Sequence, residues 1–318
     1  MAETTYKLTN WSDYNRALVR RGSLSVWFSE KAVDQWCYDG PPQWGTDPTY
    51  ADFAIEVCLR LRLVYHLPLR QTQGFVESLF ALMDLDLPVP DYSTLSRRGQ
   101  DLSIDLCLSK QKDQDRPRHL VIDSTGLKVY GEGEWKQRQH GKSKRRTWRK
   151  LHIGLDEETG EITAERLTGN DKHDCSQVED LLEQTLDQGE AISHVGGDGA
   201  YDKWKSYQAI EAVGAEPVIP PQKNAKIKRH GNCKGPRLAR DEAIRYIRRH
   251  GRGKWKRVHG YHRRSLAETA LYRFKQLIGR VLRARRLATQ RTEARLGCQI
   301  LNRMTALGMP ESVAVAVR

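Results

Sequence analysis

Apolar residues recur at helical spacing through most of the first hundred positions. The stretch from Tyr50 to His66 has few helix breakers and the following apolar residues: Phe53, Ile55, Val57, Leu59, Leu61 and Val64. A second stretch, from Leu67 to about Met83, places Phe75, Val76, Leu79 and Phe80 on one face of a helix. Apolar side chains three and four positions apart share one face of a helix, which packs on a core. The pattern predicts a mostly helical N-terminal region.

A turn and a short polar segment follow these helices. Residues 84–90 contain two prolines, and residues 91–98 begin with the capping residue Asp91 and end with Arg97 and Arg98. Helix, turn and short basic helix is the layout of a helix-turn-helix DNA reader. An ordinary helical hairpin has the same pattern, and both interpretations remain open. In the first of them, Arg97 and Arg98 contact DNA.

After Pro117 the spacing of apolar residues changes to that of short strands. The predicted strands are 119–123 with its continuation 127–130, 148–156, 161–168, 193–198 and 216–220. The predicted helices among and after them are 174–188, 201–213 and 264–283. The order β-β-β-α-β-α-β-α is that of the ribonuclease H-like fold, an α/β class with a mixed sheet.

Charge along the chain is uneven and indicates a polyanionic partner. The 318 residues carry a formal net charge of +13, with 38% hydrophobic and 29% charged residues. Residues 223–318 hold 26 Lys and Arg against 5 Asp and Glu, whereas residues 151–222 hold 4 against 16. The positive charges in residues 223–318 repel one another, and an anionic partner such as nucleic acid would offset this repulsion. The sequence lacks a membrane-spanning run or an export signal, and its six cysteines lack a C-x-x-C pair, so we expect reduced cytoplasmic thiols.

Two aspartates stand at the ends of predicted neighbouring strands. Asp123 follows Leu-Val-Ile and precedes Ser-Thr-Gly, and Asp198 follows Val-Gly-Gly and precedes Gly-Ala-Tyr. An aspartate at the end of a strand commonly caps a turn through its side chain. Two of them at adjacent strand ends also fit phosphoryl transfer with two divalent ions, because carboxylates hold such ions close together.

Glu268 is a third candidate, on the last predicted helix. At about 100° per residue, Tyr261, Arg264, Tyr272 and Lys275 fall within about 40° of Glu268. An acidic residue framed by cations suits an active-site edge that grips a DNA backbone. Alternatively, Ser265 and Glu268 form a capping box, which starts the helix at Ser265 rather than near Tyr261. The buried side of this helix is predicted to comprise Leu266, Ala270, Phe274, Leu277 and Val281.

A basic arm precedes the second strand. Residues 142–150 contain six cations around Trp148, among them Lys144, Arg145 and Arg146, and Trp135 lies shortly before. We expect the arm to contact phosphates. Trp148 either stacks on an unpaired base or packs on the sheet, and the second interpretation is favoured.

These residues also carry a family resemblance. The spacing Tyr261-x₂-Arg264-x₃-Glu268-x₆-Lys275 is similar to the Y-R-E-K signature of bacterial insertion-sequence transposases of the DDE class. The motifs V-I-D-S-T-G-L-K around Asp123 and G-D-G-A-Y-D around Asp198 resemble that class's first two catalytic aspartates. The opening L-T-N-W-S-D-Y, the segment R-G-S-L-S-V-W, G-E-G-E-W-K and the terminal L-N-R-M-T look like the insertion sequence five family.

The resemblance implies a DNA transposase. Asp123, Asp198 and Glu268 would bind two Mg²⁺ ions, with Mn²⁺ able to substitute, to cut at element ends and join 3′-hydroxyls to target DNA. Tyr261, Arg264 and Lys275 would contact DNA near the scissile phosphate. The expected partners are double-stranded DNA, as terminal inverted repeats and as target, and further copies of the chain, at least a dimer for synapsis. The alternative is a catalytically silent DNA-binding repressor derived from a transposase.

The expected organisation has three parts. Residues 1–115 form a helical DNA-binding region, which would recognise the inverted repeats. Residues 116–290 form a ribonuclease H-like catalytic domain with a basic insertion at about 222–260, and residues 291–318 form a C-terminal helical tail. The expected location is the cytoplasm, at the bacterial nucleoid.

Overall fold

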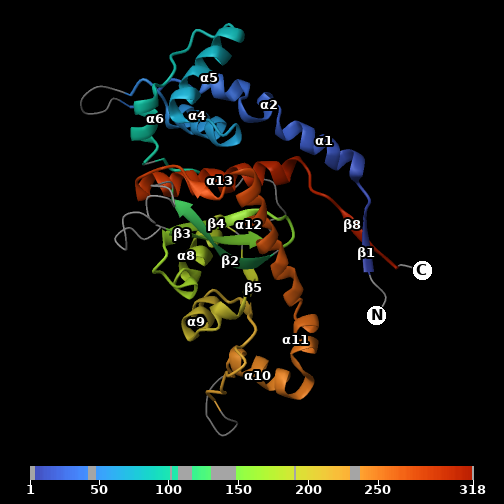
Figure 1. The fold of residues 1–318 in the computed structure, drawn as a ribbon. Helices are drawn as coiled ribbons and strands as arrows, with labels where there is room; N and C mark the ends of the chain where they lie inside the picture. Colours follow the sequence, from blue (N-terminus) through green and yellow to red (C-terminus); the bar gives the residue numbers. More distant parts are fainter. Residues whose placement is uncertain are drawn as a thin grey trace, which may run out of the picture. The chain divides into compact units, whose positions relative to one another are not determined.

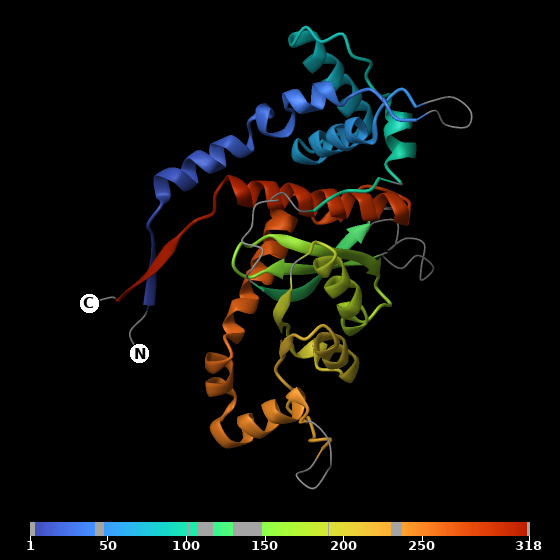
Figure 2. The same ribbon diagram turned by 180° about the vertical axis from the view of Figure 1, so that it is seen from behind.

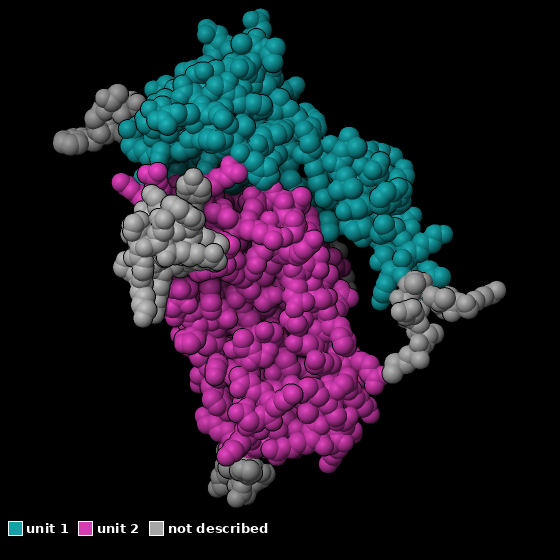
Figure 3. Space-filling view, in the orientation of Figure 1, with its two compact units in different colours: residues 1–108, 299–318 teal, residues 109–298 magenta. Residues whose placement is uncertain are grey.

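The computed structural model describes residues 4–41, 48–100, 102–106, 117–129, 148–189, 191–229 and 237–316. The chain divides into two compact units (Figure 3): unit 1, residues 1–108 with 299–318, and unit 2, residues 109–298. Among the described helices, none is long and apolar enough to cross a membrane.

Unit 1 is mostly helical, as the apolar spacing predicts. It contains β1 (Thr4–Leu8), α1 (Trp11–Arg21), α2 (Leu24–Trp27), α3 (Glu30–Asp34), α4 (Asp52–Val64), α5 (Leu69–Leu82), α6 (Tyr92–Arg98), the C-terminal part of α13 (Leu287–Leu307) and β8 (Ser312–Ala316). Its core includes an aromatic cluster, in which the ring centroids of Trp36 and Phe80 lie 4.9 Å apart. The Trp36 indole N–H donates to the carbonyl of Pro88 at 2.7 Å, which ties the turn before α6 to this core.

The C-terminal segment, expected to be a helical tail, ends in a strand instead. β8 pairs antiparallel with β1, with Thr4 opposite Ala316 and Leu8 opposite Ser312, and Figures 1 and 2 both show the two strands side by side. Alternating valines, Val313 and Val315, favour extended backbone. The partner strand is at the other end of the sequence, so a local pattern could not reveal the pairing.

Unit 2 is built on a mixed sheet with the strand order β4-β3-β2-β5-β6. Its elements are β2 (Arg118–Val129), β3 (Trp148–Asp156), β4 (Ile162–Gly169), α8 (Val178–Leu186), β5 (Ile192–Gly196), α9 (Trp204–Ala212), β6 (Glu216–Val218), α10 (Ala239–His250), α11 (Arg252–Val258), α12 (Ser265–Leu277), β7 (Val281–Leu282) and the first part of α13. β2, β3 and β4 pair antiparallel, while β5 runs parallel to β2 and β6 parallel to β5. This is the ribonuclease H-like arrangement, so the predicted fold class is confirmed.

The two faces of β2 carry different chemistry. Leu120 and Ile122 are buried in the apolar core that α8 and α9 form on one face of the sheet. Because successive side chains of a strand point to opposite faces, Val121 and Asp123 point to the other face. Helix α12 contacts β2 as well, and Arg264, at its start, and Glu268 act electrostatically on Asp123. Asp123, in the middle of β2, therefore faces α12.

The basic insertion at 222–260 contains two helices that its sequence pattern does not reveal. α10 buries Ile244, and α11 buries Trp255. Gly251 separates them with φ of 83°, a left-handed conformation that favours glycine. Few apolar side chains hold these helices, and the many arginines and lysines mask their periodicity.

The helix carrying Glu268 is shorter than predicted and begins differently. A 3₁₀ turn, η3 (Tyr261–Arg264), runs directly into α12, so Ser265 is helical and no capping box forms. The predicted burial of Leu266 and Val281 is wrong, since they are 37% and 40% exposed. The buried residues of α12 are Ala267, Ala270, Leu271 and Phe274. The packed face thus lies beside Glu268 rather than opposite it, which lets Glu268 reach the sheet.

Close packing of α13 on α12 gives a stability prediction. A Cβ atom at Gly297 would lie 2.6 Å from the Phe274 ring and 3.1 Å from Ile278. We expect Gly297→Val to lower the free energy of unfolding by about 1–3 kcal/mol, measured by urea denaturation, because the core has no room for the side chain. Gly253→Val in α11, with open space around it, is the matched control and should change stability by no more than about 0.5 kcal/mol. Equal losses in both variants would contradict this explanation.

Candidate functional site

Asp123 and Asp198 occupy equivalent positions on two neighbouring parallel strands. Val121 of β2 pairs with Gly196 of β5, and each aspartate lies two residues beyond this pair. Both aspartates therefore lie just beyond the last residue pair that joins β2 and β5, at the same end of that pairing. Ligand sites of open α/β sheets lie at such carboxyl ends of strands.

Local hydrogen bonds orient each aspartate. The Asp123 Oδ1 accepts from the backbone N–H of Ser124 at 2.8 Å, and the Asp198 Oδ1 accepts from that of Ala200 at 2.8 Å. Asp198 is the cap of the short turn η2 (Gly199–Tyr201). Asp198 therefore has the turn-capping role that the sequence allows for such residues. Among the described residues, none donates a hydrogen bond to the second carboxylate oxygen of Asp123 or Asp198.

Glu268 lies on α12 and acts electrostatically on Asp123. Its Oε1 lies 2.7 Å from Nη2 of Arg264, one helical turn earlier. The Arg264 guanidinium lies over the ring of Tyr261, 5.4 Å from its centroid. Tyr261, Arg264 and Glu268 are thus a connected group, as the predicted stripe requires. Lys275 lies two turns further along α12, half-buried, and no ion pair to it is found within the described ranges.

The pKa of Asp123 reflects its burial and the charges around it. It is raised to about 6, first because the group is buried. The Ser124 N–H and the Arg264 guanidinium lower this pKa, whereas the carboxylates of Asp198 and Glu268 raise it. Asp198, beyond β5, and Glu268, on α12, therefore both act on the buried carboxylate of Asp123.

These three carboxylates fit a divalent cation in their donor chemistry. Carboxylate oxygens are the ligands that Mg²⁺ and Mn²⁺ prefer, and a cation would stabilise the charged form of Asp123, which burial first and then the carboxylates of Asp198 and Glu268 disfavour. In the described part of the chain, no group of three or more acidic, histidine or cysteine side chains is already drawn together as a metal site.

Two residues near the site, Asp174 and Trp255, were not predicted from the sequence. Asp174 accepts from Ser124 Oγ at 2.9 Å and from Lys150 Nζ at 3.1 Å, and so braces the residue after Asp123. Trp255, 1% exposed, packs against Tyr261 with ring centroids 6.1 Å apart. Asp174 stands before a predicted helix, where an acidic residue is ordinary, and Trp255 lies in a segment without a clear pattern, so neither gave a usable signal.

The remaining predicted DNA contacts are placed as follows. Lys144, Arg145 and Arg146 lie outside the described residues. Trp148, at the start of β3, lies across Gly126 of β2, where an added Cβ atom would be 3.3 Å from its ring. The favoured interpretation of Trp148, packing on the sheet, matches this placement. The Lys128 ammonium also lies 5.7 Å from the centroid of the Trp148 ring.

Arg97 and Arg98 lie in the last turn of α6. Asp91 caps this helix by accepting from the N–H groups of Ser93 and Thr94 at 2.8 and 3.0 Å, which gives the predicted helix, turn and short basic helix. Arg98 pairs with Asp52 at 2.7 Å within unit 1, whereas Arg97 contacts only Thr94, at 3.3 Å, within the ranges described. Contact of either residue with DNA stays a prediction.

Family comparisons cover most of the chain. Residues 114–303 match a family described as a transposase DDE domain, and residues 19–132 match a second family with the same description. The first match alone spans more than half of the chain and includes Asp123, Asp198 and Glu268.

Solved structures with some likeness to the chain are also transposases. They are the Drosophila P element transposase strand transfer complex (15% identity, TM-score 0.30, 54% of this chain), the piggyBac transposase synaptic complex with hairpin DNA (9%, 0.35, 94%) and the Mos1 transposase paired-end complex with left transposon end (8%, 0.23, 56%). The chain spans 38%, 76% and 61% of these proteins, respectively. The family assignment depends on the two family matches and not on these distant structures.

Proposed function

The chain belongs to the family of proteins with a transposase DDE domain, and from this premise we propose that it is a DNA transposase whose catalytic residues are Asp123, Asp198 and Glu268. It binds terminal inverted repeats, cleaves at element ends and joins the 3′-hydroxyls to target DNA. The observation that carries the proposal is the equivalent placement of Asp123 and Asp198 beyond one residue pair of β2 and β5, with Glu268 acting on Asp123 from α12. The motif resemblance supports a bacterial element of the insertion sequence five family.

Asp123, Asp198 and Glu268 would hold divalent metal ions, Mg²⁺ in the first place. When bound, these ions supply activation of the attacking oxygen and stabilisation of the leaving oxygen. The protein's contribution is to fix the carboxylates on a rigid sheet edge and on α12. The backbone N–H bonds from Ser124 and Ala200 hold Asp123 and Asp198 in place before any ligand arrives.

The cations of α12 and its preceding turn hold the DNA strand. Arg264 is bonded to Glu268 and faces Asp123 electrostatically, so it neutralises part of the acidic cluster when DNA is absent. An incoming phosphate offers Arg264 a stronger bidentate partner and frees Glu268 to act with the two aspartates. Tyr261 supports the guanidinium through its ring, and Lys275 provides a further cation along the same helix.

The proposed biology follows from the reaction. Joining two element ends requires that both be held in one synaptic complex, so the active form is at least a dimer. Double-stranded DNA is the substrate and the bacterial nucleoid the site of action. A catalytically silent repressor has no need of all three carboxylates, and nothing in the site favours that alternative.

A cleavage assay on DNA from the boundary of the encoding element tests this function. We expect the purified chain to nick this duplex at the element end in Mg²⁺ or Mn²⁺ and to leave it intact in EDTA, because the carboxylates need the ion to act on phosphate. A duplex of equal length and scrambled sequence is the control. Tight, specific binding of the end without any cleavage in either metal would support the repressor instead.

A further inference from the structure

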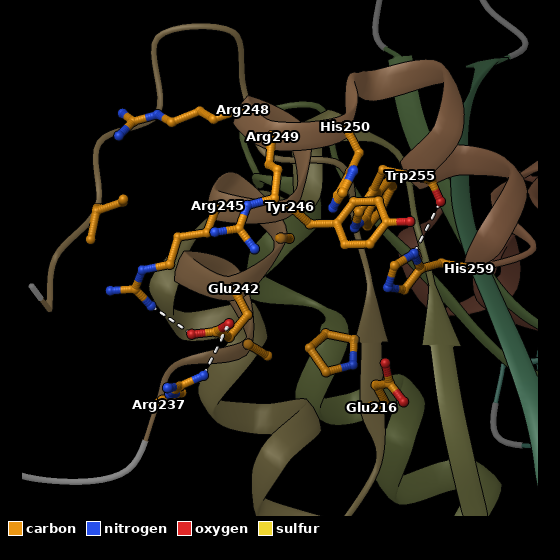
Figure 4. Close-up of a pocket in the computed structure, with 14 residues that line it drawn as sticks. Glu216, Arg237, Glu242, Arg245, Tyr246, Arg248, Arg249, His250, Trp255 and His259 are labelled. Atoms are coloured by element: carbon orange, nitrogen blue, oxygen red, sulfur yellow. Dashed lines mark hydrogen bonds and ion pairs between the residues drawn. The ribbon is translucent and has the colours of Figure 1, made fainter. Parts of the chain in front are cut away.

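A large basic pocket lies away from the three carboxylates, between α10, α11 and the edge strand β6 (Figure 4). Its volume is about 930 Å³. Its wall is formed mainly by arginines and aromatic rings, including Arg245, Arg248, Arg249, Tyr246, Trp255 and His259. A pocket of this composition suits an anionic ligand.

The arginines of the pocket are only partly neutralised. Glu242 pairs with Arg245 at 2.6 Å and with Arg237 at 3.8 Å. Arg248 and Arg249 are exposed, and neither has an ion-pair or hydrogen-bond partner in the described portion of the chain. Cations in the last turn of a helix stabilise the helix by interacting with its dipole. This interaction explains why the arginines lie at the end of α10, but it does not explain the pocket that they line.

Trp255 and His259 form an aromatic wall of the pocket. The Trp255 side chain is 1% exposed, and its ring stacks on His259 with centroids 4.9 Å apart and an interplanar angle of 22°. This packing holds α11 in place beside the arginines of α10.

The pocket adjoins the catalytic region. Glu216 and His259 also line a second cavity of about 360 Å³, whose wall includes Tyr261 and Arg264. This second cavity reaches Val121, two residues before Asp123 on the same face of β2. A single extended ligand can therefore follow the surface from α10 to Val121 and Arg264.

We propose that the α10–α11 pocket binds successive phosphates of one strand of the DNA that is cut at the carboxylates. This inference rests on the proposed function for the identity of the ligand. Arg248 and Arg249 contact the phosphates, and the second cavity carries the strand towards Arg264. A strand fits the two adjoining cavities, whereas a single small anion would leave one of them unused.

Salt-dependent binding tests the proposal without any catalytic step. The affinity of the full chain for a short element-end duplex is measured by fluorescence anisotropy in EDTA over a range of NaCl concentrations. Loss of two phosphate contacts in the double variant Arg248→Ala/Arg249→Ala should lower the slope of log K against log salt by about 1.8. Lys254→Ala/Arg257→Ala is the matched control, because it removes the same charge from exposed positions of α11 outside the pocket. Its slope should equal that of the wild type.

Two outcomes would overturn the proposal. One is an unchanged slope in the pocket variant; if inorganic phosphate or a mononucleotide then binds in a way that depends on Arg248 and Arg249, the pocket is a site for a small anion. The other is an equal loss in both double variants, which would report net charge alone.

Failure of the proposed cleavage function and failure of the proposed role of the pocket give different results. Because the binding measurement contains no metal, a chain that cannot cut DNA would still show the change in slope. A chain that cuts DNA and shows no change would overturn only the role of the pocket.

Discussion

Asp123→Asn should reduce the rate of DNA cleavage by about 1,000-fold or more, equivalent to roughly 4 kcal/mol of activation free energy. Asparagine has the same shape and retains an oxygen that accepts from the Ser124 N–H. It removes the negative charge that Asp198 and Glu268 already oppose. The melting temperature should therefore be equal to or higher than that of the wild type, while single-turnover cleavage of element-end DNA is lost.

The control for Asp123→Asn is Asp171→Asn. Asp171 makes an exposed ion pair with Lys172 at 3.5 Å, and surface pairs of this kind contribute little to stability. This variant should cleave DNA at the wild-type rate. If Asp123→Asn cleaves as fast as the wild type, the assignment of catalysis to this carboxylate is wrong. If it loses its fold, the electrostatic explanation of the site is wrong.

Arg264→Ala should reduce cleavage and strand transfer by about 100-fold with the fold retained, a loss comparable to removing one charge-stabilising donor from an active site. Arg264 is the cation that both bonds Glu268 and lowers the pKa of Asp123. Arg264→Lys should recover only part of the activity, because an ammonium cannot form a bidentate contact with phosphate. Lys275→Ala should show a smaller loss in the same assay.

Arg263→Ala provides the comparison within the same turn. Arg263 also lines the second cavity, but its guanidinium is paired with Glu157 and its side chain is 56% exposed. Its loss should change the cleavage rate by no more than a few-fold. Equal losses in the Arg263 and Arg264 variants would indicate a general effect of basic charge and would contradict a specific grip on the strand by Arg264.

The sequence predicts the sheet and the placement of the two aspartates in it well because both depend on short-range signals. The apolar run before Asp123 becomes β2, and the alternation after Trp148 becomes β3, paired from Leu120 to Lys128. Once the two strand ends are known to be neighbours, the positions of Asp123 and Asp198 follow from the parallel pairing of β2 with β5. No long-range packing detail is needed for this step.

Glu268 is found from sequence by its spacing, but the packing of its helix is not. Ideal helical geometry from Tyr261 onwards places the buried face opposite Glu268. The chain instead makes a 3₁₀ turn at Tyr261–Arg264, and α12 packs through Ala267 and Leu271. A glutamate opposite the packed face would point away from the sheet. The position of α12 on the sheet is a tertiary property that a single-helix pattern does not contain.

The segment around Trp255 was the least predictable part of the site. α10 and α11 bury few side chains, and their arginines dominate the sequence pattern. The contact between Trp255 and Tyr261 depends on how these helices fold back before η3. The pairing of Asp174 with Ser124 and Lys150 likewise joins residues far apart in the sequence. Contacts of this kind leave no local signal.

The most direct test of the central claim is a change of metal preference at Asp198. In Asp198→Cys, a soft thiolate replaces a hard carboxylate, and it accepts Mn²⁺ more readily than Mg²⁺. We expect the wild type to cleave element-end DNA in both metals, whereas the variant is inactive in Mg²⁺ and regains cleavage in Mn²⁺. Cleavage by the variant at equal rates in Mg²⁺ and Mn²⁺ would contradict a metal-binding role for Asp198.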